Sequence, residues 1–262
     1  MKYIWHALKM QLKSALQYRS SLLMQVIAQF VMTGGEMLAV VVLLTRFKAV
    51  GHWGATEIMF FFGVMQSTFA LTELFGRGIT AFSYFVQRGE FDALILRPKP
   101  LLLQVVCRQL DPRRLGSFLV GVIAIGVAAS RLEIAWTLGK ILLLADVVIC
   151  SMLLLLGLFM VEATVSFFSV KSIEMVNILT YGGRSACQYP VDVYPAPLRL
   201  LFTWLAPFAM CMHWPISAVI GQPMVTLPGW AYYLTPLAGA AFFVLMVCIW
   251  YIGVRHYRST GT

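Results

Sequence analysis

Residues 138–168, LGKILLLADVVICSMLLLLGLFMVEATVSFF, form a strongly apolar stretch with very few charges. A transmembrane helix needs ~20 apolar residues, so this stretch can cross a bilayer with a tilt or project beyond it. Of the 262 residues, 60% are hydrophobic and only 12% are charged. That is more apolar surface than a soluble core of this size can bury, so we predict an all-α polytopic membrane protein.

Other apolar stretches lie on both sides of this one, and together they predict six crossings within a single transmembrane domain over residues 1–262. A less regular apolar region, 173–222, supplies one crossing. The remaining candidate spans are 21–44, 57–76, 115–130 and 231–253.

The less regular region is interrupted by QYPVDVYPAP at 188–197, where three prolines and Asp192 forbid a continuous helix. We expect a helix that reaches the outer surface, a turn, and a second apolar helix that only dips into the membrane. Irregular backbone is tolerated at that depth where protein or a cavity surrounds it. The sequence thus predicts an extracytoplasmic or re-entrant region over 188–230, with its break at Tyr189, Pro190, Tyr194, Pro195 and Pro197.

The first twenty residues carry a helical pattern with one apolar face and one basic face. Trp5, Leu8 and Leu12 fall on the apolar side, and Lys9 and Lys13 lie largely opposite. This pattern predicts an amphipathic helix over 1–20 that lies in the headgroup region of the bilayer. The alternative is a cytosolic extension of the first span.

The net charge of +9 reflects basic residues placed between the apolar stretches, without interleaved aromatic residues. This favours the positive-inside effect over binding of nucleic acid, and we expect no nucleic-acid partner. If the N-terminus is inside, 14 of the 20 Lys and Arg residues are inside, so both termini are predicted to be cytoplasmic. The inner segments are 1–20, 77–114, 169–172 and 254–262, and Arg184 is among the six basic residues assigned outside.

Motifs for catalysis or metal binding are missing from the sequence. It contains no GxxxxGK[ST] phosphate loop, no HExxH and no GxSxG. The four histidines are scattered, and the five cysteines form no CxxC pair. We therefore predict no enzyme activity, no metal site and no cofactor in this chain.

Polar residues within spans are costly and usually face a partner or a cavity. In the first span Gln25, Gln29 and Glu36 follow helical spacing and can share one face. That face lines a translocation pathway or a subunit interface, or it only bonds to neighbouring helices. Glu73 and Arg77, four residues apart near the inner end of the second span, are predicted to form a structural ion pair.

A charged cassette, RGEFDALILRPKP at 88–100, stands between the second and third spans. Glu90 and Asp92 precede an apolar stretch, Arg97 closes it and Pro98 stops it, which predicts a short helix. A helix of this length is unstable alone in water, so its apolar face must dock. The apolar face consists of Phe91, Leu94 and Ile95. It packs either against the ends of its own spans or in a groove of a partner.

The motif GEFDALILRP, the amphipathic N-terminal helix, the six spans and the YPVDVYP break together resemble the membrane permease of the type-2 ABC exporter superfamily (ABC-2). More narrowly, the chain is similar to the bacterial branch with a Gly-Glu-Phe-Asp…Leu…Arg-Pro cytoplasmic motif, and the resemblance covers essentially the whole chain. It implies an export permease of the bacterial cytoplasmic membrane whose cassette is a coupling helix seated in a cleft of a separate ATPase. The coupling residues it implies are Glu90, Phe91, Asp92, Leu94, Arg97 and Pro98.

The resemblance also implies partners. Two copies of the ATPase would carry ATP and Mg. A second permease subunit would complete the pathway in the lipid bilayer. That subunit is identical or related, and the resemblance favours a non-identical one. The broken region would form short re-entrant helices that close the outer end. Two other functions stay open: an ion-coupled carrier with protons on Glu36, Asp146 or Glu162, and a non-transport membrane scaffold or enzyme.

Overall fold

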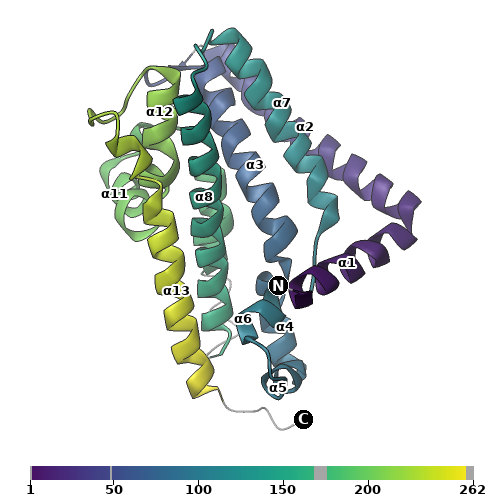
Figure 1. Cartoon of the computed structure of the whole chain (residues 1–262). Helices are drawn as coiled ribbons and strands as arrows, with labels where there is room; N and C mark the ends of the chain where they lie inside the picture. The colour runs from purple at the N-terminus through teal and green to yellow at the C-terminus, as the bar shows by residue number, and fades with distance from the viewer. Residues whose placement is uncertain (1, 48, 168–175, 258–262) are drawn as a thin grey trace.

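The computed structural model describes residues 2–47, 49–167 and 176–257 (Figure 1). The predicted inner segment 169–172 and the last five residues of the predicted inner segment 254–262 lie outside this range. Five helices are long and apolar enough to cross a membrane, which confirms the five regular spans predicted from the sequence. They are α2 (Arg19–Phe47), α3 (Ala55–Thr80), α7 (Leu115–Arg131), α8 (Leu138–Val165) and α13 (Leu237–His256).

Helix α3 lies at the centre of the bundle, between α7 and α8. Helix α2 packs on the far side of α7, and α13 packs along α8 (Figure 1). In the most apolar part of α3, 83% of the residues are buried, against 6% in α2. An apolar helix with so little of its surface buried is suited to face lipid or another subunit.

Close approach of α3 and α7 depends on Gly121. A Cβ atom at this position would lie 2.3 Å from Ser67 Oγ and 2.7 Å from the Ser67 backbone nitrogen. Small residues let transmembrane backbones approach, and the contact here leaves no room for a side chain.

We expect Gly121→Leu to push α7 off α3. Because the clash involves backbone, the loss of stability should reach about 3 kcal/mol, the upper end for an overpacked core. The midpoint of unfolding in a detergent titration measures it. Gly126→Leu on the same helix is the matched control, since a Cβ there meets nothing within 4 Å. Equal midpoints for the two variants would contradict the packing argument.

The fifth region is irregular, as its prolines predict. It begins with a π-helical turn (Ile178–Gly182), α10 (Gly183–Ala186) and a 3₁₀ turn (Val191–Val193). Two short helices follow, Ala196–Leu205 and Ala209–Ile220, bent by 81° at the break. They comprise α11 (Ala196–Leu200) with a π-helical turn (Leu201–Leu205), then a π-helical turn (Ala209–His213) with α12 (Trp214–Ile220).

The bent pair returns to the end of the bundle from which it starts. Asp192, before the pair, and Met224, after it, line the same cavity. A chain that enters and leaves on one side is the arrangement expected of the predicted re-entrant region. A 3₁₀ turn (Ala231–Tyr233) then leads into α13.

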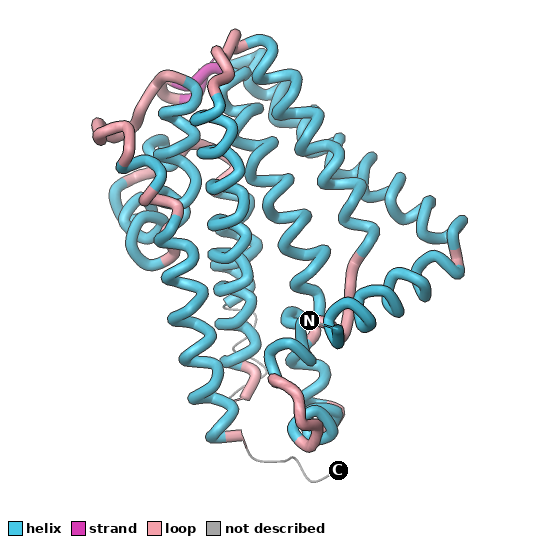
Figure 2. Tube along the Cα trace, viewed as in Figure 1, coloured by secondary structure: helices cyan, strands magenta, loops and turns pink. Residues whose placement is uncertain are grey.

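A small hairpin of β1 (Ala49–Val50) and β2 (Trp53–Gly54) joins α2 to α3 at this end of the bundle (Figure 2). Gly51 takes a positive φ of 65° in its turn, a conformation that favours glycine. The Trp53 indole donates to both carboxylate oxygens of Asp192, at 3.0 and 3.1 Å. The hairpin therefore fastens the proline-rich break to the top of the bundle.

The opposite end carries the short helices and both ends of the described chain (Figure 1). Helix α1 (Lys2–Gln17) folds back from the start of α2 toward the lower part of the bundle. The other short elements here are α4 (Phe82–Gln87), α5 (Glu90–Ile95), α6 (Leu101–Val106) and a 3₁₀ turn (Pro112–Arg114).

Candidate functional site

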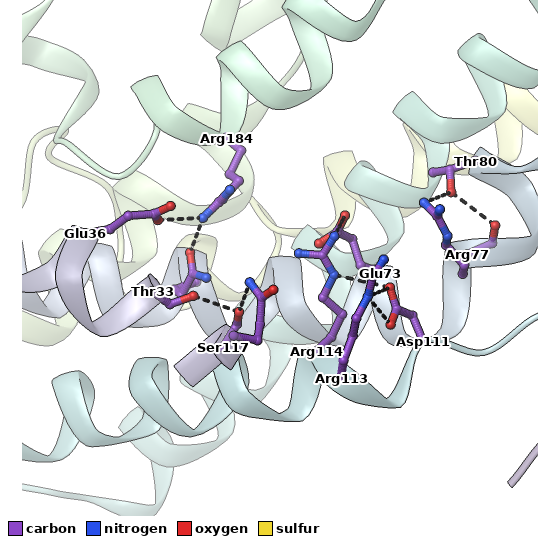
Figure 3. Close-up of polar contacts among 12 residues, drawn as sticks. Thr33, Glu36, Glu73, Arg77, Thr80, Asp111, Arg113, Arg114, Ser117 and Arg184 are labelled. Atoms are coloured by element: carbon purple, nitrogen blue, oxygen red, sulfur yellow. Dashed lines mark hydrogen bonds and ion pairs between the residues drawn. The ribbon is translucent and has the colours of Figure 1, made fainter. Parts of the chain in front are cut away.

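A row of polar side chains joins α2, α3, α7 and α10 inside the bundle (Figure 3). Unpaired polar groups are costly in an apolar medium, so such rows form where helices can satisfy one another. We call this row the polar seam; its members are Gln29, Thr33, Glu36, Gln66, Ser117 and Arg184.

Arg184 is the cation of the polar seam. Its Nη2 donates to Glu36 Oε2 at 3.0 Å and to Gln66 Oε1 at 2.8 Å. The guanidinium also lies over the Phe69 ring, 4.8 Å from its centre. Arg184 was expected among the basic residues on the outer side, and the structure corrects this: Glu36 near the middle of α2 balances its charge, and the buried Gln66 of α3 accepts a hydrogen bond from it.

The polar stripe predicted on α2 is only partly turned toward its neighbours. Gln29 donates to Ser117 Oγ at 2.9 Å, and Thr33 shares a hydrogen bond with the same oxygen at 2.8 Å. Gln25 is exposed and donates to Ser21 of its own helix at 3.2 Å. Thr33 fits the helical spacing of 29, 33 and 36, and it belongs to the stripe although the prediction named only the amides and the carboxylate.

The structure corrects the predicted pairing of Glu73 with Arg77. Glu73 is buried and accepts from Arg114 Nη2 at 2.8 Å, while Arg77 Nη1 donates to Thr80 at 3.5 Å. The Asp111 backbone nitrogen donates to the Leu74 carbonyl at 3.2 Å, which brings the start of α7 against the end of α3. Glu73 faces that junction, so the nearest cation comes from another helix.

Asp111 completes this charged junction. It accepts two hydrogen bonds from Arg113 Nε, at 2.7 and 2.8 Å, and lies 3.5 Å from Arg114 Nε. The sequence DPRR at 111–114 is the signal that could have predicted it: an acidic residue and two arginines around a proline at a helix start.

The cassette at 88–100 folds into α5 and the turn after it. Gly89 takes a positive φ of 68° between α4 and α5, a position that favours glycine. The helix ends at Ile95, three residues before Pro98, in keeping with the bias against helix in the residue before a proline.

Phe91 faces its own spans. Its ring is fully buried, with ring centres 5.0 Å away at Phe82, 5.0 Å at Tyr257 and 5.7 Å at Phe167. Leu94 is buried as well. The structure therefore corrects the prediction that these two side chains contact a partner: they anchor α5 to the bundle.

The other cassette residues lie nearer the surface. Arg97 and Pro98 are exposed, and Glu90 is half-buried in an ion pair with Arg108. Asp92 lies beside Tyr257. The pKa of the Tyr257 hydroxyl is raised, mainly by burial and to a smaller extent by the Asp92 carboxylate. Leu96, which the predicted set omitted, has 85% of its surface exposed.

The break residues hold the outer end together. The Tyr194 hydroxyl donates to the Ala186 carbonyl at 2.8 Å, and the Tyr189 backbone nitrogen donates to the same oxygen at 3.1 Å. Pro190 is buried at the turn. Pro195 immediately precedes α11 and Pro197 lies in its first turn, where a missing N–H costs no hydrogen bond.

No cluster of three or more His, Cys, Asp or Glu side chains with a metal-binding arrangement occurs in the described ranges. The arrangement is that of a helical bundle with an internal polar seam, a re-entrant pair at one end and an anchored short helix at the other. A comparison with protein-family models matches residues 30–261 to the ABC-2 family transporter protein. The chain belongs to the ABC-2 transporter family.

Membership makes this ABC-2 chain the membrane permease of an ABC transporter, a transport subunit and not itself an enzyme. It also implies partnership with an ABC ATPase. This favours the permease over the ion-coupled carrier and the scaffold as its function. Comparisons with curated proteins and with solved structures found no match.

Proposed function

We propose that this ABC-2 permease is part of an ATP-driven exporter of a bacterial cytoplasmic membrane, with both termini in the cytoplasm. A separate ATPase, present in two copies, binds ATP and Mg and docks on the end of the bundle that carries α4, α5 and α6. One observation carries the proposal: α5 is anchored to the spans by Phe91 while its tip presents Leu96 outward.

An anchored tip of this kind can pass on motion. Phe91 packs against Phe82 at the start of α4, which directly follows α3, and against Phe167 beyond α8 and Tyr257 beyond α13. A push on α5 therefore reaches three membrane helices through one aromatic cluster. Leu96 is followed by Arg97 and Lys99. An exposed leucine next to two cations is suited to bind an apolar pocket of the ATPase that has acidic residues around it.

A second permease subunit would complete the pathway, with α2 as part of the contact. Most of the apolar surface of α2 is unburied in a single chain. The polar seam lies directly behind that surface, and Glu36 is its most exposed member with a side chain about half accessible. A related but non-identical partner is favoured by the resemblance of the cassette and the break to the bacterial exporters.

To test the coupling, the chain with Leu96→Asp is co-expressed with its ATPase and purified. A carboxylate in place of an anchor that fills an apolar pocket should cost about 2 kcal/mol or more, so the yield of complex falls at least about tenfold. Leu96→Met is the matched control and should retain the complex, because the volume and polarity are kept. If both variants bind the ATPase equally well, α5 is not the docking element.

The direction of transport is tested separately in vesicles with the ATPase sites facing outward. For an exporter, added ATP should drive substrate from the ATPase side into the lumen. Movement that follows a proton gradient and persists without ATP would favour the ion-coupled carrier instead.

A further inference from the structure

Two cavities lie side by side where α1 approaches the bundle, and they share Leu110 and Pro112 in their walls. The first has a volume of about 440 Å³, and eight of its twelve lining residues have polar side chains. The second, of about 350 Å³, is lined by apolar side chains apart from Lys9. A polar cavity next to an apolar one fits a molecule with one polar and one apolar part.

The polar cavity favours an anion. Arg77 and Arg113 line it, with Asp111 as the single acidic residue, and Lys9 stands at the neighbouring apolar cavity. Arg113 is already committed to Asp111 by two hydrogen bonds. Arg77 has five N–H donors, of which one meets Thr80 at 3.5 Å, so its fork can receive a phosphate (Figure 3).

Hydroxyl groups surround the same cavity. Ser14 comes from α1, Tyr18 from the turn that follows it, and Ser21 from the start of α2. Each can donate a further hydrogen bond to a phosphate oxygen.

The apolar cavity has exposed apolar side chains on two walls. Trp5 and Leu12 expose about half or more of their surface on α1, and Phe75 and Leu115 are exposed on α3 and α7. Covering apolar surface is favourable in proportion to the area removed from water, and each buried methylene of a chain adds to it. An acyl chain between the walls would cover both at once.

We propose that an anionic phospholipid binds here, with its phosphate at Arg77 and one acyl chain along the apolar face of α1. The lipid fills the space between α1 and the bundle. Helix α1 is tied to the bundle on another side by a hydrogen bond from Gln11 to the Arg108 carbonyl at 2.6 Å. The proposal depends on the membrane location of the chain and not on the ATPase.

The test is native mass spectrometry of the full chain, loaded with phosphatidylglycerol or with phosphatidylcholine of the same acyl chains. We expect one phosphatidylglycerol to be retained in preference to phosphatidylcholine. Arg77→Gln should weaken that retention about tenfold, since a hydrogen bond to a charged group contributes about 1.5–3 kcal/mol. Lys9→Gln, an exposed change that leaves the fold intact, should weaken it by a smaller factor.

Arg131→Gln is the matched control, because it removes an exposed arginine at the other end of α7. It should leave lipid retention unchanged. Equal retention of the two lipids, or equal retention by Arg77→Gln and Arg131→Gln, would overturn the proposal. So would displacement of the lipid by inorganic phosphate alone, or a loss of ATPase binding in Arg77→Gln with lipid retention intact.

Discussion

Replacing Arg114 by Met should destabilise the protein by about 3–5 kcal/mol, because it leaves the Glu73 carboxylate buried without its cation. Glu73 is almost fully buried, and its Oε1 accepts from Arg114 at 2.8 Å. Its other oxygen, Oε2, has no hydrogen-bond partner in the described structure. The midpoint of unfolding in a detergent titration measures the loss.

The double variant Glu73→Gln with Arg114→Met should recover most of that stability, since it removes the stranded charge along with its partner. Arg113→Met is the control. Its side chain is 42% exposed against 19% for Arg114, so its pair with Asp111 should contribute no more than about 1 kcal/mol. A double variant as unstable as Arg114→Met alone would show that the pair with Glu73 is not the cause.

The spans and the re-entrant break could be predicted from the sequence because each depends on local composition. A run such as 141–165 is apolar whatever surrounds it, and Pro190, Pro195 and Pro197 interrupt helices in any context. The bend of 81° between the two short helices also follows a proline, Pro207, within the break.

The partners inside the bundle could not be predicted in the same way. Glu73 has Arg77 one helical turn away, yet its bond goes to Arg114, 41 residues along the chain. Arg184 was assigned outside by the order of the predicted spans and the count of Lys and Arg, and its partner Glu36 is 148 residues distant. Such contacts depend on helix packing, and a charge pattern read along one chain carries no information on which faces meet.

Phe91 shows the same limit at the proposed coupling element. The spacing of Phe91, Leu94 and Ile95 predicts one apolar face, but not whether that face turns inward or outward. In the structure two of the three are buried and Ile95 is exposed. The inward direction is set by Phe167 and Tyr257, which arrive from distant parts of the chain to meet the ring.

Phe91→Ala should therefore weaken the packing of α5 against the bundle and leave the exposed surface of α5 unchanged. Removing a fully buried phenylalanine costs about 3–5 kcal/mol, and here the loss falls on the contacts of α5 with the start of α4 and the end of α13. Because α5 lies at one end of the bundle, we expect faster amide hydrogen exchange across α4 to α6 and little change in α8 or α12.

Comparison with Leu96→Asp separates anchoring from docking. Leu96 is exposed, so its substitution should leave exchange and stability unchanged while lowering ATPase binding. Phe91→Ala should keep the docking tip yet loosen its connection to the spans, so ATP hydrolysis by the bound ATPase continues while transport per ATP falls. Phe91→Leu, which keeps most of the buried volume, should restore much of the coupling. If Phe91→Ala instead leaves transport per ATP unchanged, the aromatic cluster does not carry the motion, and the connection between ATPase and spans must run through α4 or α6.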